Sequence, residues 1–181
     1  MTRGISILMY HQVGYFLPMK AHRSTYCHYK RFAAQMAYLH RFGYAVLPFS
    51  QALKCLGGEQ PIPPRAVTLT FDDGYENFFE YAYPVLQGYG YSAMVYLISG
   101  LVGKPSSWFQ ADGRDTPPLM SRERILQLRD QGIEFGAHSV SHVRLATLDA
   151  ERMREEVFGC RHQLEQLLGG PVLDFCYPYG S

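Results

Sequence analysis

Two adjacent carboxylates and two spaced imidazoles are the residues of this chain best suited to chemistry. Asp72 and Asp73 follow the apolar run Val67–Phe71, and His138 and His142 come much later, four residues apart. Successive side chains on an extended chain point in opposite directions, so one aspartate can hold a metal while the other moves a proton. Asp-Gly is also a common turn signal, and for these two aspartates alone an ordinary polar turn is the simpler interpretation.

The spacing of His138 and His142 suits a metal ion. On a helical turn, residues i and i+4 share one face, so both rings can reach the same ion. No glutamate follows His138, which excludes the helical His-Glu-x-x-His protease motif. Two imidazoles and one carboxylate leave coordination positions open, as catalytic zinc requires, and they also suit ferrous iron or cobalt. A single histidine is more often a surface or core residue, so this pair needs support from other residues.

Three further stretches are candidates for contact with a substrate. Tyr177-Pro178-Tyr179-Gly180 predicts either a tight loop whose backbone N–H groups face a ligand or simply a turn. Trp108, the only tryptophan, lies in a long predicted loop over residues 99–119. It could stack on a sugar ring or cap the core. His11 directly follows a predicted strand over residues 5–10.

Strand and helix patterns alternate along the chain. Apolar runs predict strands at residues 5–10, 44–47, 67–71, 93–98, 133–137 and 172–176, and residues 14–25 are predicted to be irregular. Helical patterns cover residues 29–42, 51–56, 76–86, 121–131 and 149–168. Ser50 is predicted to cap the second helix, and Pro84 to kink or restart the third. The last helix has a stripe of inward-facing residues that begins at Met153. This alternation predicts a parallel sheet, either open or closed into a barrel.

The candidate residues share one position in this pattern. His11, Asp72-Asp73, His138 and residues 178–180 all lie just past the ends of predicted strands. In parallel α/β folds the carboxyl ends of the strands carry the chemistry. The sequence therefore predicts one site at this end of the sheet.

Length and composition indicate an ordinary globular protein. The 181 residues suit a single domain over the whole chain (1–181), and 47% hydrophobic with 18% charged residues argues against disorder. A net charge of +1 gives no case for nucleic acid or an anionic membrane. No apolar run could span a bilayer, and no basic-then-apolar leader is visible, so we expect a cytoplasmic protein unless a longer natural chain carries an export signal. The four scattered cysteines are predicted to be reduced thiols: Cys27, Cys55, Cys160 and Cys176.

Three motifs in order resemble those of polysaccharide deacetylases, which form carbohydrate esterase family 4 with its nodulation-deacetylase-like domain. They are Thr70-Phe71-Asp72-Asp73-Gly74, His138-Ser139-Val140-Ser141-His142 and Tyr177-Pro178-Tyr179-Gly180. The opening Met9-Tyr10-His11-Gln12-Val13 is also similar, so the resemblance covers the chain from about Ile5 to its end. It implies a distorted (β/α) barrel and a metal-dependent hydrolase that removes acetyl groups from N-acetylated sugars or polysaccharide.

The resemblance also implies roles for individual residues. By motif position, Asp73, His138 and His142 would bind a divalent metal, Zn²⁺ first, with Co²⁺, Ni²⁺ or Fe²⁺ as alternatives. Asp72 would be the general base, and the backbone N–H of Tyr179 would help to hold the oxyanion. The remaining candidates for substrate binding are His11, Trp108, Tyr177 and Pro178.

Two departures from the family pattern leave rival interpretations open. Many members carry an arginine at the position of Cys176, where it pairs with the base. The family also takes its catalytic acid, a histidine, from a later motif, and a full barrel needs roughly 250 residues. We therefore expect a chain that is incomplete at its C-terminus, with the acid beyond Ser181. The alternatives are a non-catalytic or relic carbohydrate-binding domain, a metal-assisted amidohydrolase for a small amide or O-acetyl ester, and plain polar turns without metal.

Overall fold

The computed structural model describes residues 4–17, 22–108 and 115–180. The chain forms two compact units, one of residues 1–71 and 77–94 and the other of residues 72–76 and 95–181. Both units combine strands with helices, so the predicted α/β class is confirmed, while closure into a barrel stays a prediction. Within the described ranges, no helix has both the length and the apolar composition needed to cross a lipid bilayer.

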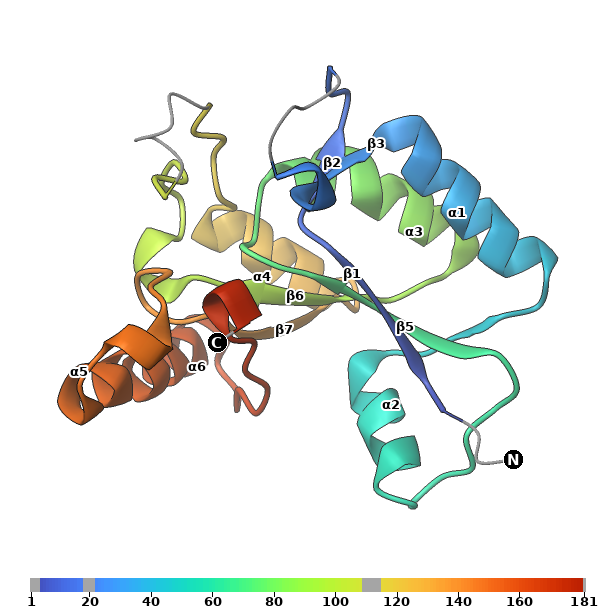
Figure 1. Ribbon diagram of the computed structural model, residues 1–181. Helices are drawn as coiled ribbons and strands as arrows, with labels where there is room; N and C mark the ends of the chain where they lie inside the picture. Colours follow the sequence, from blue (N-terminus) through green and yellow to red (C-terminus); the bar gives the residue numbers. More distant parts are fainter. Residues whose placement is uncertain (1–3, 18–21, 109–114, 181) are drawn as a thin grey trace. The chain divides into compact units, whose positions relative to one another are not determined.

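The first unit is built on the strand β5 (Ala66–Phe71). All of its residues are buried, as its apolar and β-branched sequence favours. β1 (Ser6–Tyr10) lies parallel beside it, with Ser6 opposite Val67 (Figure 1). β4 (Ala45–Val46) pairs in parallel with the first residues of β5. The predicted strands and their parallel direction are therefore confirmed in this unit.

Of two helices in the first unit, one was predicted correctly and the other begins earlier than predicted. α1 (Tyr29–Arg41) was predicted, and it buries its apolar residues at helical spacing: Phe32, Met36 and Leu39. α2 (Phe49–Leu56) begins earlier than predicted, with Pro48 at the N-cap position. Ser50 therefore lies inside the first turn and is not the cap. The fixed φ of proline suits the start of a helix and explains the earlier boundary.

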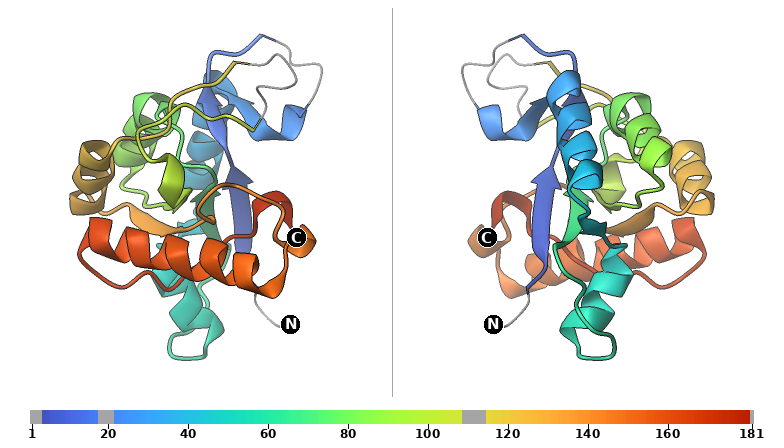
Figure 2. Two further views of the ribbon diagram at one scale, coloured as in Figure 1. Left: turned by 90° about the vertical axis from the view of Figure 1, so that its left-hand side faces the viewer. Right: turned by 90° about the vertical axis from the view of Figure 1, so that its right-hand side faces the viewer.

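A π-helical turn, η2 (Phe78–Ala82), runs directly into α3 (Tyr83–Tyr89). Pro84 lies in the first turn of α3, directly after the π turn, where its missing N–H interrupts the regular α-helical hydrogen bonds. The predicted restart at Pro84 is thus confirmed. α3 contacts α1 within this unit (Figure 2).

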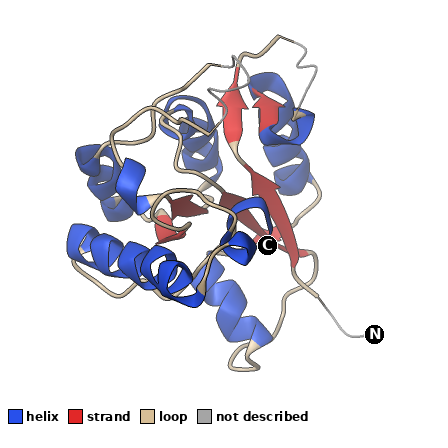
Figure 3. Cartoon of the chain, turned by 60° about the vertical axis from the view of Figure 1, so that its left-hand side comes forward, coloured by secondary structure: helices blue, strands red, loops and turns tan. Residues whose placement is uncertain are grey.

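A small parallel sheet within the first unit was not predicted. β2 (Gln12–Gly14) pairs with β3 (Tyr26–His28), and a 3₁₀ turn, η1 (Arg23–Thr25), precedes β3 (Figure 3). The expectation of an irregular segment was therefore wrong where it overlaps these elements. Strands of three residues are too short to display the alternation by which strands are recognised in sequence.

The second unit contains β7 (Glu134–Ala137) and, apart from Met94, β6 (Met94–Leu97), and these two strands are neighbours in the sheet. α4 (Arg122–Asp130) begins where the Ser121 side chain accepts a hydrogen bond from the backbone of Arg124, as predicted for this cap. A last strand over residues 172–176 was also predicted. Only one parallel bridge, between Ala137 and Phe175, forms there, so that prediction was wrong in extent.

The last helix of the second unit contains a π-helical turn. α5 (Ala150–Arg154), η6 (Glu155–Gly159) and α6 (Cys160–Leu168) follow one another without a break (Figure 2). Asp149 caps the first turn, as predicted. Cys160 is fully buried, as predicted, but Met153 is 39% exposed. The prediction that this stripe of residues faces inward was therefore wrong at Met153, which precedes the π turn. A π turn inserts about one extra residue and rotates the helix face that precedes it.

Candidate metal centre

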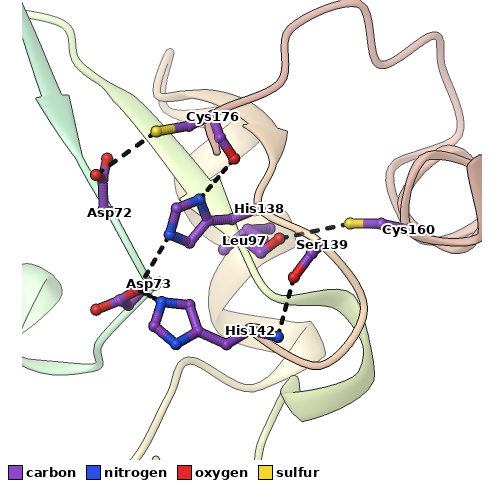
Figure 4. A network of polar contacts seen from close by, with 8 residues as sticks. All are labelled: Asp72, Asp73, Leu97, His138, Ser139, His142, Cys160 and Cys176. Atoms are coloured by element: carbon purple, nitrogen blue, oxygen red, sulfur yellow. Dashed lines mark hydrogen bonds and ion pairs between the residues drawn. The ribbon is translucent and has the colours of Figure 1, made fainter. Parts of the chain in front are cut away.

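Asp73, His138 and His142 converge in the second unit (Figure 4). Asp73 follows β5, and His138 follows β7, as the strand-end pattern predicts. The Asp73 Oδ1 atom lies 3.3 Å from His138 Nε2 and 3.2 Å from His142 Nε2. All three side chains are buried, and their candidate ligand atoms lie within 4.8 Å of one another. The structure therefore brings together the three residues that the sequence predicted as ligands.

The spacing of these atoms fits a metal ion. Ligand bonds of 2.0–2.1 Å in a tetrahedral site imply ligand–ligand separations of about 3.3 Å. The two separations from Asp73 Oδ1, 3.2 and 3.3 Å, agree with this value. Two nitrogens and one carboxylate oxygen would leave positions open for water and substrate. The donor set can therefore hold a divalent cation, without selecting one among zinc, cobalt, nickel and ferrous iron.

His138 is oriented by the backbone of the last described segment. The carbonyl oxygen of Cys176 lies 2.9 Å from His138 Nδ1, which turns Nε2 towards Asp73. The backbone N–H of Cys176 in turn donates to the carbonyl of Ala137. A hydrogen bond at one ring nitrogen fixes the tautomer and direction of a ligand histidine.

The segment 138–142, here called the histidine loop, is not a helical turn, although the i, i+4 argument assumed one. Ser139 and His142 both have left-handed backbones, with φ of 65° and 58°. The His142 N–H donates to the Ser139 hydroxyl oxygen at 2.9 Å, which closes the loop on itself. The two rings therefore meet because of an irregular loop, and the helical explanation of their spacing was wrong.

Left-handed backbone is concentrated at this site. Among the described residues, six other than glycine have positive φ, and four of them are Asp73, Ser139, His142 and Tyr179. Gly74 follows with φ of 73°, and a Cβ there would lie 2.7 Å from the Leu97 side chain. Such conformations each cost of order 1–3 kcal/mol in residues with a side chain. The fold therefore imposes this geometry on the site at a cost in stability.

The electrostatics of the pair Asp73–His138 favour opposite charges. Burial alone would lower the pKa of His138, but its hydrogen bonds to Asp73 and Cys176 and the nearby carboxylates raise it to about 10. Burial alone would raise the pKa of Asp73, but hydrogen bonds from His138 and His142 hold it well below its usual range. The raised pKa of His138 thus favours a charged ring beside Asp73 when no metal is bound.

The second aspartate points away from these rings. Asp72 is buried, and its Oδ2 atom lies 3.6 Å from the thiol of Cys176 (Figure 4). The two adjacent aspartates therefore serve different neighbours. A weakly donating thiol contacts Asp72 where many family members are expected to place an arginine.

Aromatic rings flank His142. The Trp108 ring centroid lies 4.3 Å from that of His142, and the Tyr179 centroid lies 4.8 Å from it. Trp108 is half-buried and also contacts Tyr75, so it packs on the core and borders the site at once. Arg144, which no sequence motif singled out, stacks over Tyr179 with 4.9 Å from Cζ to the ring centroid.

The other substrate candidates differ in exposure. Tyr177 is 58% exposed, whereas Pro178 is buried beside it. Tyr177 and Gly180 close a turn through a backbone hydrogen bond of 3.0 Å. His11 belongs to the first unit, where it follows β1. The roles given to these residues stay predictions, as do those of Asp72 and Tyr179.

Comparison with known proteins decides the family. The model of a family described as polysaccharide deacetylase matches residues 59–181. The chain belongs to the polysaccharide deacetylase family. The resemblance inferred from its three motifs is thus confirmed.

Relatives of this chain include proteins of two Bacillus species. YxkH of Bacillus subtilis, named as a candidate polysaccharide deacetylase, is 25% identical over 176 residues, which are 97% of this chain and 57% of YxkH. The crystal structure of a polysaccharide deacetylase from Bacillus cereus matches with a TM-score of 0.78 and 25% identity, over 99% of this chain and 52% of that one. The chain thus spans little more than half the length of either relative.

A third relative has a more specific name. A poly-beta-1,6-N-acetyl-D-glucosamine N-deacetylase of Escherichia coli is 35% identical over 72 residues, which are 40% of this chain and 11% of that protein. This match is local and covers a small part of the larger protein.

Proposed function

We propose that this chain carries the metal site of a hydrolase that removes N-acetyl groups from an N-acetylated polysaccharide. The observation that carries the proposal is the buried cluster of Asp73, His138 and His142, with ligand-like spacing, in a chain of the polysaccharide deacetylase family. Because a relative is named for poly-beta-1,6-N-acetyl-D-glucosamine, oligomers of that sugar are the first substrates to test.

The proposed chemistry is hydrolysis of an amide. A divalent cation held by these three residues supplies Lewis acidity, which acidifies water and polarises a carbonyl oxygen. Asp72 takes a proton from the attacking water as its oxygen bonds to the acetyl carbon. The backbone N–H of Tyr179 donates to the carbonyl oxygen as it becomes negative. The C–N bond then breaks as the amine takes a proton from the acid expected beyond Ser181, acetate leaves, and Asp72 releases its proton to water.

The side chains around the cluster suit a sugar substrate. Trp108 and Tyr179 place two aromatic rings beside His142, and Tyr177 is largely exposed nearby in sequence. Aromatic faces pack well on the apolar faces of sugar rings, and the Tyr hydroxyls can bond their hydroxyl groups. We therefore propose that Trp108, Tyr177 and Pro178 contact the polymer, with His11 as a further candidate.

The experiment is an assay of acetate release from N-acetylglucosamine oligomers. The protein is tested with added Zn²⁺ or Co²⁺ and after chelation, with Asp73→Asn as the inactive control. The proposal expects release that requires metal and is lost in Asp73→Asn. No release by the full natural chain with any of these metals, or release unaffected by chelation, would contradict it. Parallel assays on small amides and O-acetyl esters detect a different amidohydrolase or esterase.

A second candidate is a carbohydrate-binding domain with a relic site. Its support is the contact between Cys176 and Asp72, because a thiol cannot supply the fixed charge that an arginine would bring to the base. This candidate expects binding of the oligomers without acetate release. Binding is measured by calorimetry with the same oligomers and metals.

A further inference from the structure

The side chain of Glu156 forms hydrogen bonds with the middle of the histidine loop. Its Oε2 atom accepts hydrogen bonds from the backbone N–H groups of Val140, at 2.8 Å, and Ser141, at 2.9 Å. Its Oε1 atom accepts a further hydrogen bond from the Ser141 hydroxyl. One carboxylate thus satisfies three donors between the two histidines. Bonds of this kind to a carboxylate are roughly twice as strong as neutral ones.

The backbone carbonyls of the histidine loop are held by a different element. The 3₁₀ turn η3 (Ser99–Leu101) donates the N–H of Ser99 to the Ser139 carbonyl at 3.2 Å and that of Gly100 to the Val140 carbonyl at 3.0 Å. Backbone N–H groups of η3 therefore hold the carbonyls of Ser139 and Val140, while the Glu156 side chain holds the N–H groups of Val140 and Ser141. Of these partners, only Glu156 can be removed by a conservative substitution.

The π-helical turn explains how Glu156 reaches the loop. Glu156 lies in η6, whereas Glu155, one residue earlier in the same turn, is exposed. A π turn shifts the register of side chains relative to a regular helix and is frequent at functional sites. Here it interrupts the long helix at the residue whose carboxylate bonds the loop.

The histidine loop needs such support because its backbone is strained. Ser139 and His142 hold left-handed conformations that residues with side chains seldom adopt. Without fixed partners, the loop would relax towards commoner conformations, and the His142 ring would move relative to His138. Binding a metal would then require the ordering of the loop, which lowers affinity.

We infer that Glu156 is a positioning residue that preorganises His138 and His142 for the metal. This inference rests on the proposed metal-dependent function. Glu156→Gln is the sharpest change, because the amide keeps the size of the side chain but replaces one acceptor oxygen with a donor that faces N–H or O–H groups. Glu155→Gln is the matched control, with the same chemistry one residue away on an exposed side chain.

The test is a titration of the metal-free protein with Co²⁺, followed by visible absorption, which reports both affinity and ligand geometry. We expect Glu156→Gln to bind Co²⁺ about 10–100-fold more weakly than wild type, as changes beside metal ligands do, with a shifted absorption band. Glu155→Gln should have the Co²⁺ affinity and the absorption spectrum of wild type. Glu156→Asp keeps the charge but shortens the side chain, so it should also weaken binding.

Each other outcome overturns a distinct claim. If wild type binds no Co²⁺, the proposed function is wrong, and this inference is wrong with it. Wild-type affinity and spectrum in Glu156→Gln would end the inference alone, even if thermal stability fell, because the residue would then be merely structural. If circular dichroism shows that Glu156→Gln does not fold, Glu156→Asp decides, and unchanged affinity in that variant overturns the inference.

Discussion

The carbonyl oxygen of Cys176 lies 2.9 Å from Nδ1 of His138, across 38 residues of sequence. This contact directs the opposite ring nitrogen towards Asp73, which lies 3.3 Å away. His138 is therefore held between a backbone acceptor and a carboxylate, and both favour a proton on the ring. A metal must displace that proton, so protons and metal compete for His138.

Stability of the metal-free protein should fall at alkaline pH. The pKa of His138 is raised from 6.5 to about 10 in the folded state. The stabilisation from its ion pair is therefore complete below about pH 6.5 and is lost as pH rises through the folded pKa. Thermal unfolding is measured in the presence of a chelator. Between about pH 6.5 and pH 10, the melting temperature should fall more for wild type than for His138→Gln. Equal pH profiles would contradict the ion pair.

The Asp72→Asn substitution should separate proton transfer from metal binding. It keeps the size of the side chain and leaves Asp73 in place, so metal affinity should stay near wild type. Turnover should fall by about 10²–10⁴-fold, the usual contribution of a positioned base. Acetate release and Co²⁺ affinity are measured on the same preparations. If Asp72→Asn lost metal while Asp73→Asn kept it, the two roles would be reversed.

Much of this site follows from simple sequence rules. Asp73 and His138 were placed correctly because short apolar runs identify buried strands, and parallel strands end at one edge of a sheet. The restart at Pro84 and the cap at Ser121 were predicted because each depends on one residue and its immediate neighbours. Local chemistry of this kind can be read directly from the sequence.

The errors arise where contacts between distant residues decide the conformation. The histidine loop was assumed to be helical from its spacing, whereas contacts with Ser99 and Glu156 hold it in an irregular shape. Glu156 itself was missed because no local pattern marks a π turn in advance. β2 and β3 were missed because three-residue strands depend on their partner more than on their own sequence.

Alanine at Gly100 should destabilise the protein. A Cβ there would lie 2.6 Å from the Val140 carbonyl oxygen, which is backbone and cannot rotate away. We expect a loss of about 1–3 kcal/mol in the free energy of unfolding, as for other overpacked sites. Gly159→Ala is the control, because its Cβ would meet the Val140 side chain at an ordinary 3.5 Å. Equal urea midpoints for both variants would contradict the packing described here.

Removal of the Trp108 ring should weaken substrate binding. If the ring stacks on the polymer, Trp108→Ala should raise KM by about 2-fold to 12-fold, since an aromatic contact is worth about 0.5–1.5 kcal/mol. Trp108→Phe should keep most of the affinity. Because Trp108 also packs on His142, Co²⁺ affinity is measured in parallel. A loss of metal with unchanged KM would assign the ring to the support of His142 alone.

Direct measurement of Zn²⁺ binding tests most simply whether Asp73, His138 and His142 hold one cation. Equilibrium dialysis of the metal-free protein, with zinc determined by mass spectrometry, gives the stoichiometry and affinity for wild type and for Asp73→Asn. We predict one tightly bound ion per wild-type chain and none at the same concentration in Asp73→Asn. No tight binding by wild type, or equal binding by the variant, would contradict the metal centre.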